Sequence, residues 1–144
     1  MTTALLFDLD GTLVDSDGDH LAAFQEVFAR FGFALDRARY TAEIMGASNT
    51  MIGARFLPQL SPLERVAVLD AKEAAFRARI GAMVPTPGAL ALLNYAQARG
   101  LPCAIVTNAP RANAEKVLAA LGLADRLTTL VIGPEVAQIG RAHV

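Results

Sequence analysis

The spacing of apolar residues changes along the chain and divides it into two kinds of segment. A continuous apolar run at residues 4–7 has the length of a buried strand, and it ends abruptly in acidic residues. From about residue 17 to residue 80 the apolar side chains recur at helical spacing instead, which predicts helices with no strand between them. We expect these helices at about 17–31, 37–45, 50–57 and 62–79.

Beyond residue 80 the pattern alternates between helices and strands. Apolar strands are expected at 102–106 and 128–132. Thr86, between two prolines, is predicted to cap the helix before the first of these strands, and Pro110 opens the helix before the second. This order predicts an α/β fold, in which a parallel, partial Rossmann-like sheet of three strands is interrupted by an inserted helical subdomain.

The last helix of the insertion has the clearest start signal. Ser61 and Glu64 have the spacing of a capping box, in which each side chain accepts a hydrogen bond from the other residue's backbone N–H. Pro62 stands at the first helical position, where the missing N–H of proline costs nothing.

Composition excludes several classes of protein. The chain has 144 residues, of which 53% are hydrophobic, so a disordered chain is excluded. A net charge of −1 gives no electrostatic basis for binding nucleic acid or an anionic membrane, and no apolar run reaches the roughly 20 residues of a membrane helix. The N-terminus lacks a secretory signal, and Cys103, expected to be a small buried residue, is the only cysteine, so we expect a cytoplasmic protein. The sequence does not indicate the oligomeric state.

Two aspartates directly follow the first expected strand. Because side chains alternate along a strand, Asp8 and Asp10 should project from the same side of its carboxyl end. Two carboxylates placed in this way need a cation or a shared proton, and the carboxyl ends of strands are where open α/β sheets bind ligands. An Asp-Gly turn is the simpler interpretation, but the whole run of residues 8–16 is more specific than a turn.

A hydroxyl and an amide follow the second expected strand, at Thr107 and Asn108. A helix begins directly after them, and helix N-termini attract oxyanions. Capping of that helix by either side chain is an alternative explanation for the pair. Because the strands are expected to be parallel, binding of a phosphate beside the acidic strand end is the favoured interpretation.

The run Asp8-Leu9-Asp10-Gly11-Thr12 resembles the first motif of the haloacid dehalogenase-like superfamily of aspartate-nucleophile phosphatases. The next four residues, Leu13-Val14-Asp15-Ser16, resemble the branch with a helical cap, which includes phosphoglycolate phosphatase and β-phosphoglucomutase. The resemblance implies an α/β core made of residues 1–14 and 83–138, with the cap at 15–82.

The resemblance also implies a reaction, which is phosphoryl transfer from a small-molecule phosphate ester through an aspartyl-phosphate. Asp8 would be the nucleophile and Asp10 the general acid and base. Both would hold Mg²⁺, Asp10 through its backbone carbonyl. The residues implied to bind the phosphate are Leu9, Gly11, Thr107 and Asn108.

Three residues of the expected cap, His20, Ser48 and Asn49, are candidates for substrate contact. A lone histidine near a helix start is equally well explained as a solvated or capping residue. Ser48 and Asn49 stand where several relatives have an arginine that grips a second phosphate. A phosphatase is therefore expected first, and a β-phosphoglucomutase-like mutase and a non-catalytic phosphate-binding relative are the alternatives.

Near its end the sequence departs from the family pattern. The family places a lysine beyond the third strand and acidic metal ligands after a fourth, but Lys72 and Lys116 are the only lysines and neither has the required position. Residues 139–144 resemble a translated sequencing adapter, so we expect a non-native tail; a genuine tail with Arg141 in place of the lysine is the alternative. The expected consequences are a first strand at the sheet edge and a 144-residue fragment with little or no activity.

Overall fold

The computed structural model describes residues 3–136 of the chain. These residues form two compact units, one made of residues 3–16 and 80–136 and the other of Asp17–Arg79. The expected tail at 139–144 lies outside the described residues.

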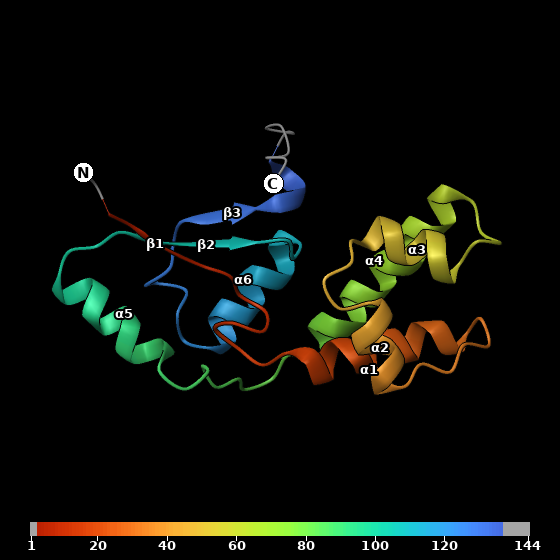
Figure 1. Cartoon of the computed structure of the whole chain (residues 1–144), viewed down its shortest axis with the longest axis horizontal. Coiled ribbons are helices and arrows are strands. Elements are labelled where there is room, and N and C mark those ends of the chain that lie inside the picture. The colour runs from red at the N-terminus through yellow and green to blue at the C-terminus, as the bar shows by residue number, and fades with distance from the viewer. Residues whose placement is uncertain (1–2, 137–144) are drawn as a thin grey trace. The chain divides into compact units, whose positions relative to one another are not determined.

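The first unit is built on a parallel sheet with the strand order β1-β2-β3 (Figure 1). Its elements in chain order are β1 (Leu5–Phe7), α5 (Ala89–Ala98), β2 (Cys103–Thr107), α6 (Arg111–Ala120), β3 (Leu130–Ile132) and the 3₁₀ turn η1 (Gly133–Glu135). Parallel neighbours need crossover connections, and α6 supplies the one between β2 and β3. The predicted α/β fold with a three-stranded parallel sheet is confirmed.

β1 lies at one edge of this sheet within the described residues, as predicted. Leu6 in β1 is 68% exposed, whereas Ile105 in the central strand is fully buried. The helices contribute buried apolar side chains to the core of the unit, among them Leu93 of α5 and Val117 and Leu118 of α6. Burial of these aliphatic side chains contributes about 1.5–3 kcal/mol each to folding.

The prediction that Thr86 caps α5 is wrong. The N-cap of α5 is Gly88, and no side chain hydrogen-bonds to that helix start. Thr86 is engaged elsewhere, because its Oγ1 donates to the carbonyl of Thr12 at 2.6 Å and its N–H donates to the carbonyl of Leu13 at 2.9 Å. Thr86 thus joins the two segments of this unit across the site where the helical unit is inserted.

The second unit consists of the four predicted helices (Figure 1). They are α1 (Asp17–Ala29), α2 (Arg37–Glu43), α3 (Asn49–Phe56) and α4 (Pro62–Arg79). The capping box of α4 is confirmed: the N–H of Ser61 donates to Oε2 of Glu64 at 2.7 Å, and the N–H of Glu64 donates to Oγ of Ser61 at 3.4 Å. The side-chain hydroxyl of Ser61 and its backbone N–H, both acting on the Glu64 carboxylate, lower the pKa of Glu64.

Aromatic rings fill the centre of the helical unit. The Phe28 ring lies 5.4 Å from the rings of both Phe24 and Phe56, measured between centroids. Phe28 and Phe56 are almost completely buried, and aliphatic side chains from the surrounding helices and loops complete the cluster. Large aromatic side chains dominate the burial energy of a small unit such as this one. None of the helices between residues 3 and 136 combines the length and the hydropathy needed to span a bilayer.

Candidate active site

The chain leaves β1 through a segment that carries two carboxylates. Asp8 is exposed, Leu9 is fully buried and Asp10 is half-buried, so the alternation of the strand continues for three residues beyond Phe7. The N–H of Leu9 donates to Oδ1 of Asp8 at 2.8 Å. Burial of Leu9 anchors the segment, with the exposed Asp8 and the half-buried Asp10 on either side of it.

A tight turn follows the carboxylates. The carbonyl of Leu9 accepts from the N–H groups of Thr12 at 3.2 Å and Leu13 at 2.9 Å. Gly11 has φ +73°, which a side chain would disfavour, and its N–H donates to the carbonyl of Val14 at 2.8 Å. The backbone N–H groups of Leu9 and Gly11 are therefore both engaged by protein acceptors, and the phosphate-binding roles of these two residues stay predictions.

Asp10 is held by a residue for which the motif predicted no role of its own. Ser16 is fully buried, and its Oγ donates to Oδ1 of Asp10 at 2.6 Å. A hydrogen bond to an ionised carboxylate is short and strong, so it fixes the orientation of the Asp10 carboxylate. The only signal in the sequence was a hydroxyl six residues downstream in the same motif.

The end of β2 presents the predicted hydroxyl and amide. Thr107 is buried and its Oγ1 accepts from the N–H of Ala109 at 3.1 Å, whereas Asn108 is exposed. The N-cap of α6 is Pro110, and no side chain caps the helix. The alternative that Thr107 or Asn108 caps α6 is therefore wrong.

The strand pairing brings the two groups to one edge of the sheet. β1 and β2 run parallel, with Phe7 opposite Ile105. Continuing this register beyond the paired residues sets 8–10 alongside Thr107 and Asn108 at the carboxyl edge, where parallel sheets bind ligands.

At the same edge of the sheet, an ion pair joins the start of α6 to the 3₁₀ turn that follows β3. Arg111, the first residue of α6, donates through Nη2 to Oε2 of Glu135 at 2.7 Å and through Nε to Oε1 at 2.9 Å. The hydrogen bonds between the two side chains raise the pKa of Arg111 and lower the pKa of Glu135. Glu115, one helical turn after Arg111, lies 3.5 Å from the same guanidinium.

Two of the three cap candidates meet a buried ion pair in the helical unit. Lys72 and Glu73 are both buried, with Nζ of Lys72 3.1 Å from Oε1 of Glu73. Nζ of Lys72 also lies 3.1 Å from Nδ1 of His20, and Nδ2 of Asn49 donates to Oε1 of Glu73 at 3.0 Å. An ammonium group only donates, so Nδ1 of His20 is the acceptor in this contact. The sequence did not indicate this pair, since adjacent charges on a helix usually face solvent.

The remaining cap candidate has a structural role of its own. Ser48 is exposed, and its side chain caps α3 by accepting from the N–H of Met51 at 3.3 Å. The ring of His20 stacks on Phe76, with centroids 3.8 Å apart and the planes within 5°. Both contacts fix the side chains within the helical unit, and contact of His20, Ser48 and Asn49 with substrate stays a prediction.

The two aspartates after β1 fit part of a magnesium site. Asp8 and Asp10 offer the oxygen ligands that a hard divalent cation prefers. Across residues 3–136 there is no group of three or more His, Cys, Asp or Glu side chains able to hold a metal. Among the described residues, the predicted site thus has the Asp8 carboxylate and the oxygens of Asp10, without a cluster of three acidic side chains.

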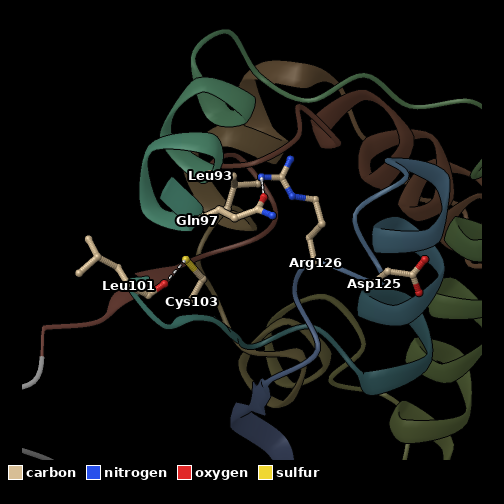
Figure 2. A pocket seen from close by; sticks show the side chains of 6 residues that line it. All are labelled: Leu93, Gln97, Leu101, Cys103, Asp125 and Arg126. Carbon is tan, nitrogen blue, oxygen red and sulfur yellow. Dashed lines mark hydrogen bonds between the residues drawn. The ribbon is translucent and has the colours of Figure 1, made fainter. Parts of the chain in front are cut away.

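A hollow of about 310 Å³ lies at the opposite end of β2 (Figure 2). It is lined by Leu93, Gln97, Leu101, Cys103, Asp125 and Arg126. Cys103 is the first residue of β2 and Thr107 the last, so this hollow and the acidic segment lie at opposite edges of the sheet. The expectation that Cys103 is buried is wrong, because the residue lies at the rim of the hollow and is half-buried.

Comparison with known proteins decides the family. The model of the family described as haloacid dehalogenase-like hydrolase matches residues 5–144. The chain belongs to this family. The predicted resemblance is thereby confirmed.

Relatives within the family include phosphatases. Phosphoglycolate phosphatase of Cupriavidus necator is 33% identical over 143 residues, which cover 95% of this chain and 61% of the relative. N-acetylmuramic acid 6-phosphate phosphatase of Pseudomonas aeruginosa is 34% identical over 136 residues, which cover 89% of this chain and 58% of the relative. The chain thus spans about three fifths of the length of these curated relatives.

A solved structure with a similar fold is CbbY from Rhodobacter sphaeroides in complex with phosphate. It has a TM-score of 0.81 and 29% identity, and the match covers 95% of this chain and 66% of that chain. A mutant of CbbY from Rhodobacter sphaeroides, solved in complex with Xylulose-(1,5)bisphosphate, gives the same TM-score of 0.81.

Proposed function

We propose that this chain carries the phosphoryl-transfer site of a phosphatase that acts on a small phosphorylated metabolite. The proposal rests mainly on the parallel pairing of β1 with β2, which sets Asp8 and Asp10 at the same sheet edge as Thr107 and Asn108. Membership of the haloacid dehalogenase-like hydrolases, with phosphatases among the relatives, supports this assignment.

The proposed reaction has two steps. In the first, a carboxylate oxygen of Asp8 attacks phosphorus, the bond from phosphorus to the ester oxygen breaks, and Asp10 gives its proton to the departing alkoxide. In the second, a water attacks the aspartyl-phosphate and gives its proton to Asp10, which releases inorganic phosphate and restores both aspartates. Thr107 and Asn108 hold the phosphate oxygens during both steps, as hydrogen-bond donors.

Mg²⁺ would be held by Asp8 and by the backbone carbonyl of Asp10. When bound there, the cation offsets the negative charge of carboxylate and phosphate that otherwise keeps them apart. This chain's own residues would provide these two oxygen ligands, on a segment that is anchored by the buried Leu9.

We expect the 144-residue chain to hydrolyse esters slowly. The family's lysine beyond the third strand has no counterpart here, since Lys72 lies in α4 and Lys116 in α6. Losing one electrostatic stabiliser of a transition state lowers the rate by about 100- to 1,000-fold. Rapid Mg²⁺-dependent turnover by this chain would contradict that expectation.

Intact-mass spectrometry after incubation with p-nitrophenyl phosphate and Mg²⁺ tests the mechanism even when turnover is slow. We expect Asp10→Asn to accumulate one phosphoryl group, because p-nitrophenolate leaves without a proton whereas hydrolysis of the adduct needs a base. Asp8→Asn should show neither adduct nor product. Asp125→Asn, which removes an exposed carboxylate at the other edge of the sheet, is the control and should behave like the wild type.

Two alternatives predict different results. A β-phosphoglucomutase-like enzyme would return the phosphoryl group to a second hydroxyl of a sugar phosphate, which product analysis would detect. A non-catalytic phosphate-binding relative would bind inorganic phosphate but form no adduct in any variant.

A further inference from the structure

The 3₁₀ turn after β3 lies against the loop that carries Asn108. A Cβ atom on Gly133 would overlap Oδ1 of Asn108 and would lie 3.4 Å from the carbonyl oxygen of Thr107. Real Cβ atoms essentially never come within 3.0 Å of another heavy atom in this way. Asn108 can therefore occupy its position only because residue 133 has no side chain.

The backbone does not itself require glycine here. Six glycines of the described chain have a positive φ, and Gly133 is not among them. Any residue can adopt the conformation of Gly133, so the close approach to Asn108 is the specific constraint at this position.

The same turn is attached to the other end of the loop by the ion pair of Arg111 and Glu135. A guanidinium and a carboxylate joined at two points have a fixed relative orientation as well as a fixed distance. The turn thus contacts the loop at Asn108 through Gly133, and at the start of α6 through Glu135.

We propose that Gly133 and Glu135 are positioning residues, which set the direction of the Asn108 carboxamide toward a bound phosphate. The inference rests on the proposed function, because it assumes that Asn108 donates to a phosphate oxygen. Gly133 and Glu135 act through Asn108 and Arg111, and neither touches the phosphate in this proposal. The site therefore draws on the loops after all three strands of the described sheet.

Gly133→Ala tests the contact with little disturbance elsewhere. The added methyl group should turn the exposed Asn108 amide away while leaving the thermal unfolding midpoint close to that of the wild type, because the displaced atom ends a flexible side chain. In ¹⁵N–¹H spectra of the phosphate-free protein, the Asn108 side-chain amide signals should shift. Affinity for inorganic phosphate, titrated in the same spectra, should fall about tenfold. Gly81→Ala is the matched control, since a Cβ at residue 81 meets nothing within 4 Å.

A double-mutant comparison separates positioning from general damage. On an Asn108→Ala background the clash is gone, so Gly133→Ala should lower phosphate affinity no further. Additive losses would overturn the proposal. If the wild type binds phosphate and Gly133→Ala binds it with the same affinity, the proposal is also overturned, while the proposed function stays intact. Failure of the wild type to bind phosphate near Asp8 and Thr107 would instead overturn the proposed function together with this inference.

The ion pair gives a second, independent test. Glu135→Gln should weaken phosphate binding in the same direction by no more than about fivefold, since the pair is half-exposed. Glu115→Gln removes the weaker contact to the same guanidinium, 3.5 Å long, and should leave binding unchanged. Equal effects of the two substitutions would show that the charge of Arg111 matters and its attachment to the turn does not.

Discussion

A buried hydroxyl contributes to the orientation of the Asp10 carboxylate. Ser16 lies beyond the tight turn, and its Oγ donates to Oδ1 of Asp10 at 2.6 Å. The bond fixes the direction of the Asp10 carboxylate, so the proton that Asp10 is proposed to deliver has a defined starting position. Such a preset position matters, because proton transfer requires the donor and acceptor to be within hydrogen-bond reach.

Ser16→Ala should therefore slow proton delivery more than attack by Asp8. Departure of p-nitrophenolate needs no proton, whereas departure of the alkoxide of glycerol 2-phosphate does. We expect kcat/KM to fall about tenfold with glycerol 2-phosphate and clearly less with p-nitrophenyl phosphate. The free energy of unfolding should fall by about 1 kcal/mol, since one hydrogen bond is lost. Equal losses of kcat/KM on the two esters would show that Ser16 acts only on the fold.

Residue types could be predicted here, but contacts between residues could not. Asp8, Asp10 and Thr107 follow apolar runs, and polar groups directly after buried strands form an unusual pattern. The roles of Ser16 and Gly133 left no such signal, because a serine or a glycine is equally expected in any turn. Their partners lie across a turn or on another strand, and spacing along the chain does not record such distances.

At the scale of elements, the start of a helix was predicted correctly where its capping partners are close together in sequence. The start of α4 follows from the capping box at Ser61 and Glu64, whose hydrogen bonds join residues three apart in sequence. The predicted cap of α5 is wrong because the side chain of Thr86 donates to the carbonyl of Thr12, which is 74 residues away. Thr86 therefore bonds to an acceptor that is distant in sequence and does not cap the nearby helix.

The buried pair on α4 connects three helices of the second unit. Lys72→Met should lower the free energy of unfolding by about 3–5 kcal/mol, because it removes the ammonium group that pairs with the buried carboxylate of Glu73. The double variant Lys72→Met/Glu73→Met should recover most of this loss, since it replaces both members of the buried pair. Urea unfolding followed by the circular dichroism of the helices measures both. A single variant as stable as the wild type would contradict this account.

The pH dependence of the turn after β3 follows from its ion pair. Arg111 lowers the pKa of Glu135 in the folded protein below its ordinary value. The stabilisation from this pair is therefore fully present above the unfolded-state pKa of a glutamate and is lost as the pH falls through the folded value. In a carboxyl-detected NMR titration, Glu135 should titrate below an ordinary glutamate, and Arg111→Gln should return it toward the ordinary value. The Asn108 amide signals should move in the same pH range if the pair positions the loop.

For the whole molecule, the sequence predicted the order of elements well, because the insertion changes the apolar period from that of strands to that of helices. The edge position of β1 also followed, from the family resemblance, which implies a fourth strand beside the first that the sequence lacks. The position of the hollow lined by Cys103 and Arg126 could not be predicted, since it depends on how α5 and the segment after α6 pack at the start of β2. The pattern of apolar residues predicts the elements and their order, whereas the position of a hollow depends on how those elements pack.

The exposed edge of β1 leads to a prediction about self-association. Among residues 3–136 the sheet pairs β1 with β2 alone, and Leu6 in this strand is 68% exposed. An apolar edge strand offers unpaired backbone groups to a second chain, and a lysine on such an edge opposes that pairing through charge. We expect Leu6→Lys to reduce concentration-dependent association in sedimentation velocity experiments.

Leu63→Lys is the control for this prediction, because Leu63 is 80% exposed but lies in the first turn of α4. If exposed leucines in general drove association, both substitutions would reduce it to a similar extent. If the edge of β1 drives it, only Leu6→Lys should do so, and backbone hydrogen exchange of β1 should slow as the wild-type concentration rises. Association that persists unchanged in Leu6→Lys would show that this edge is already covered or plays no part.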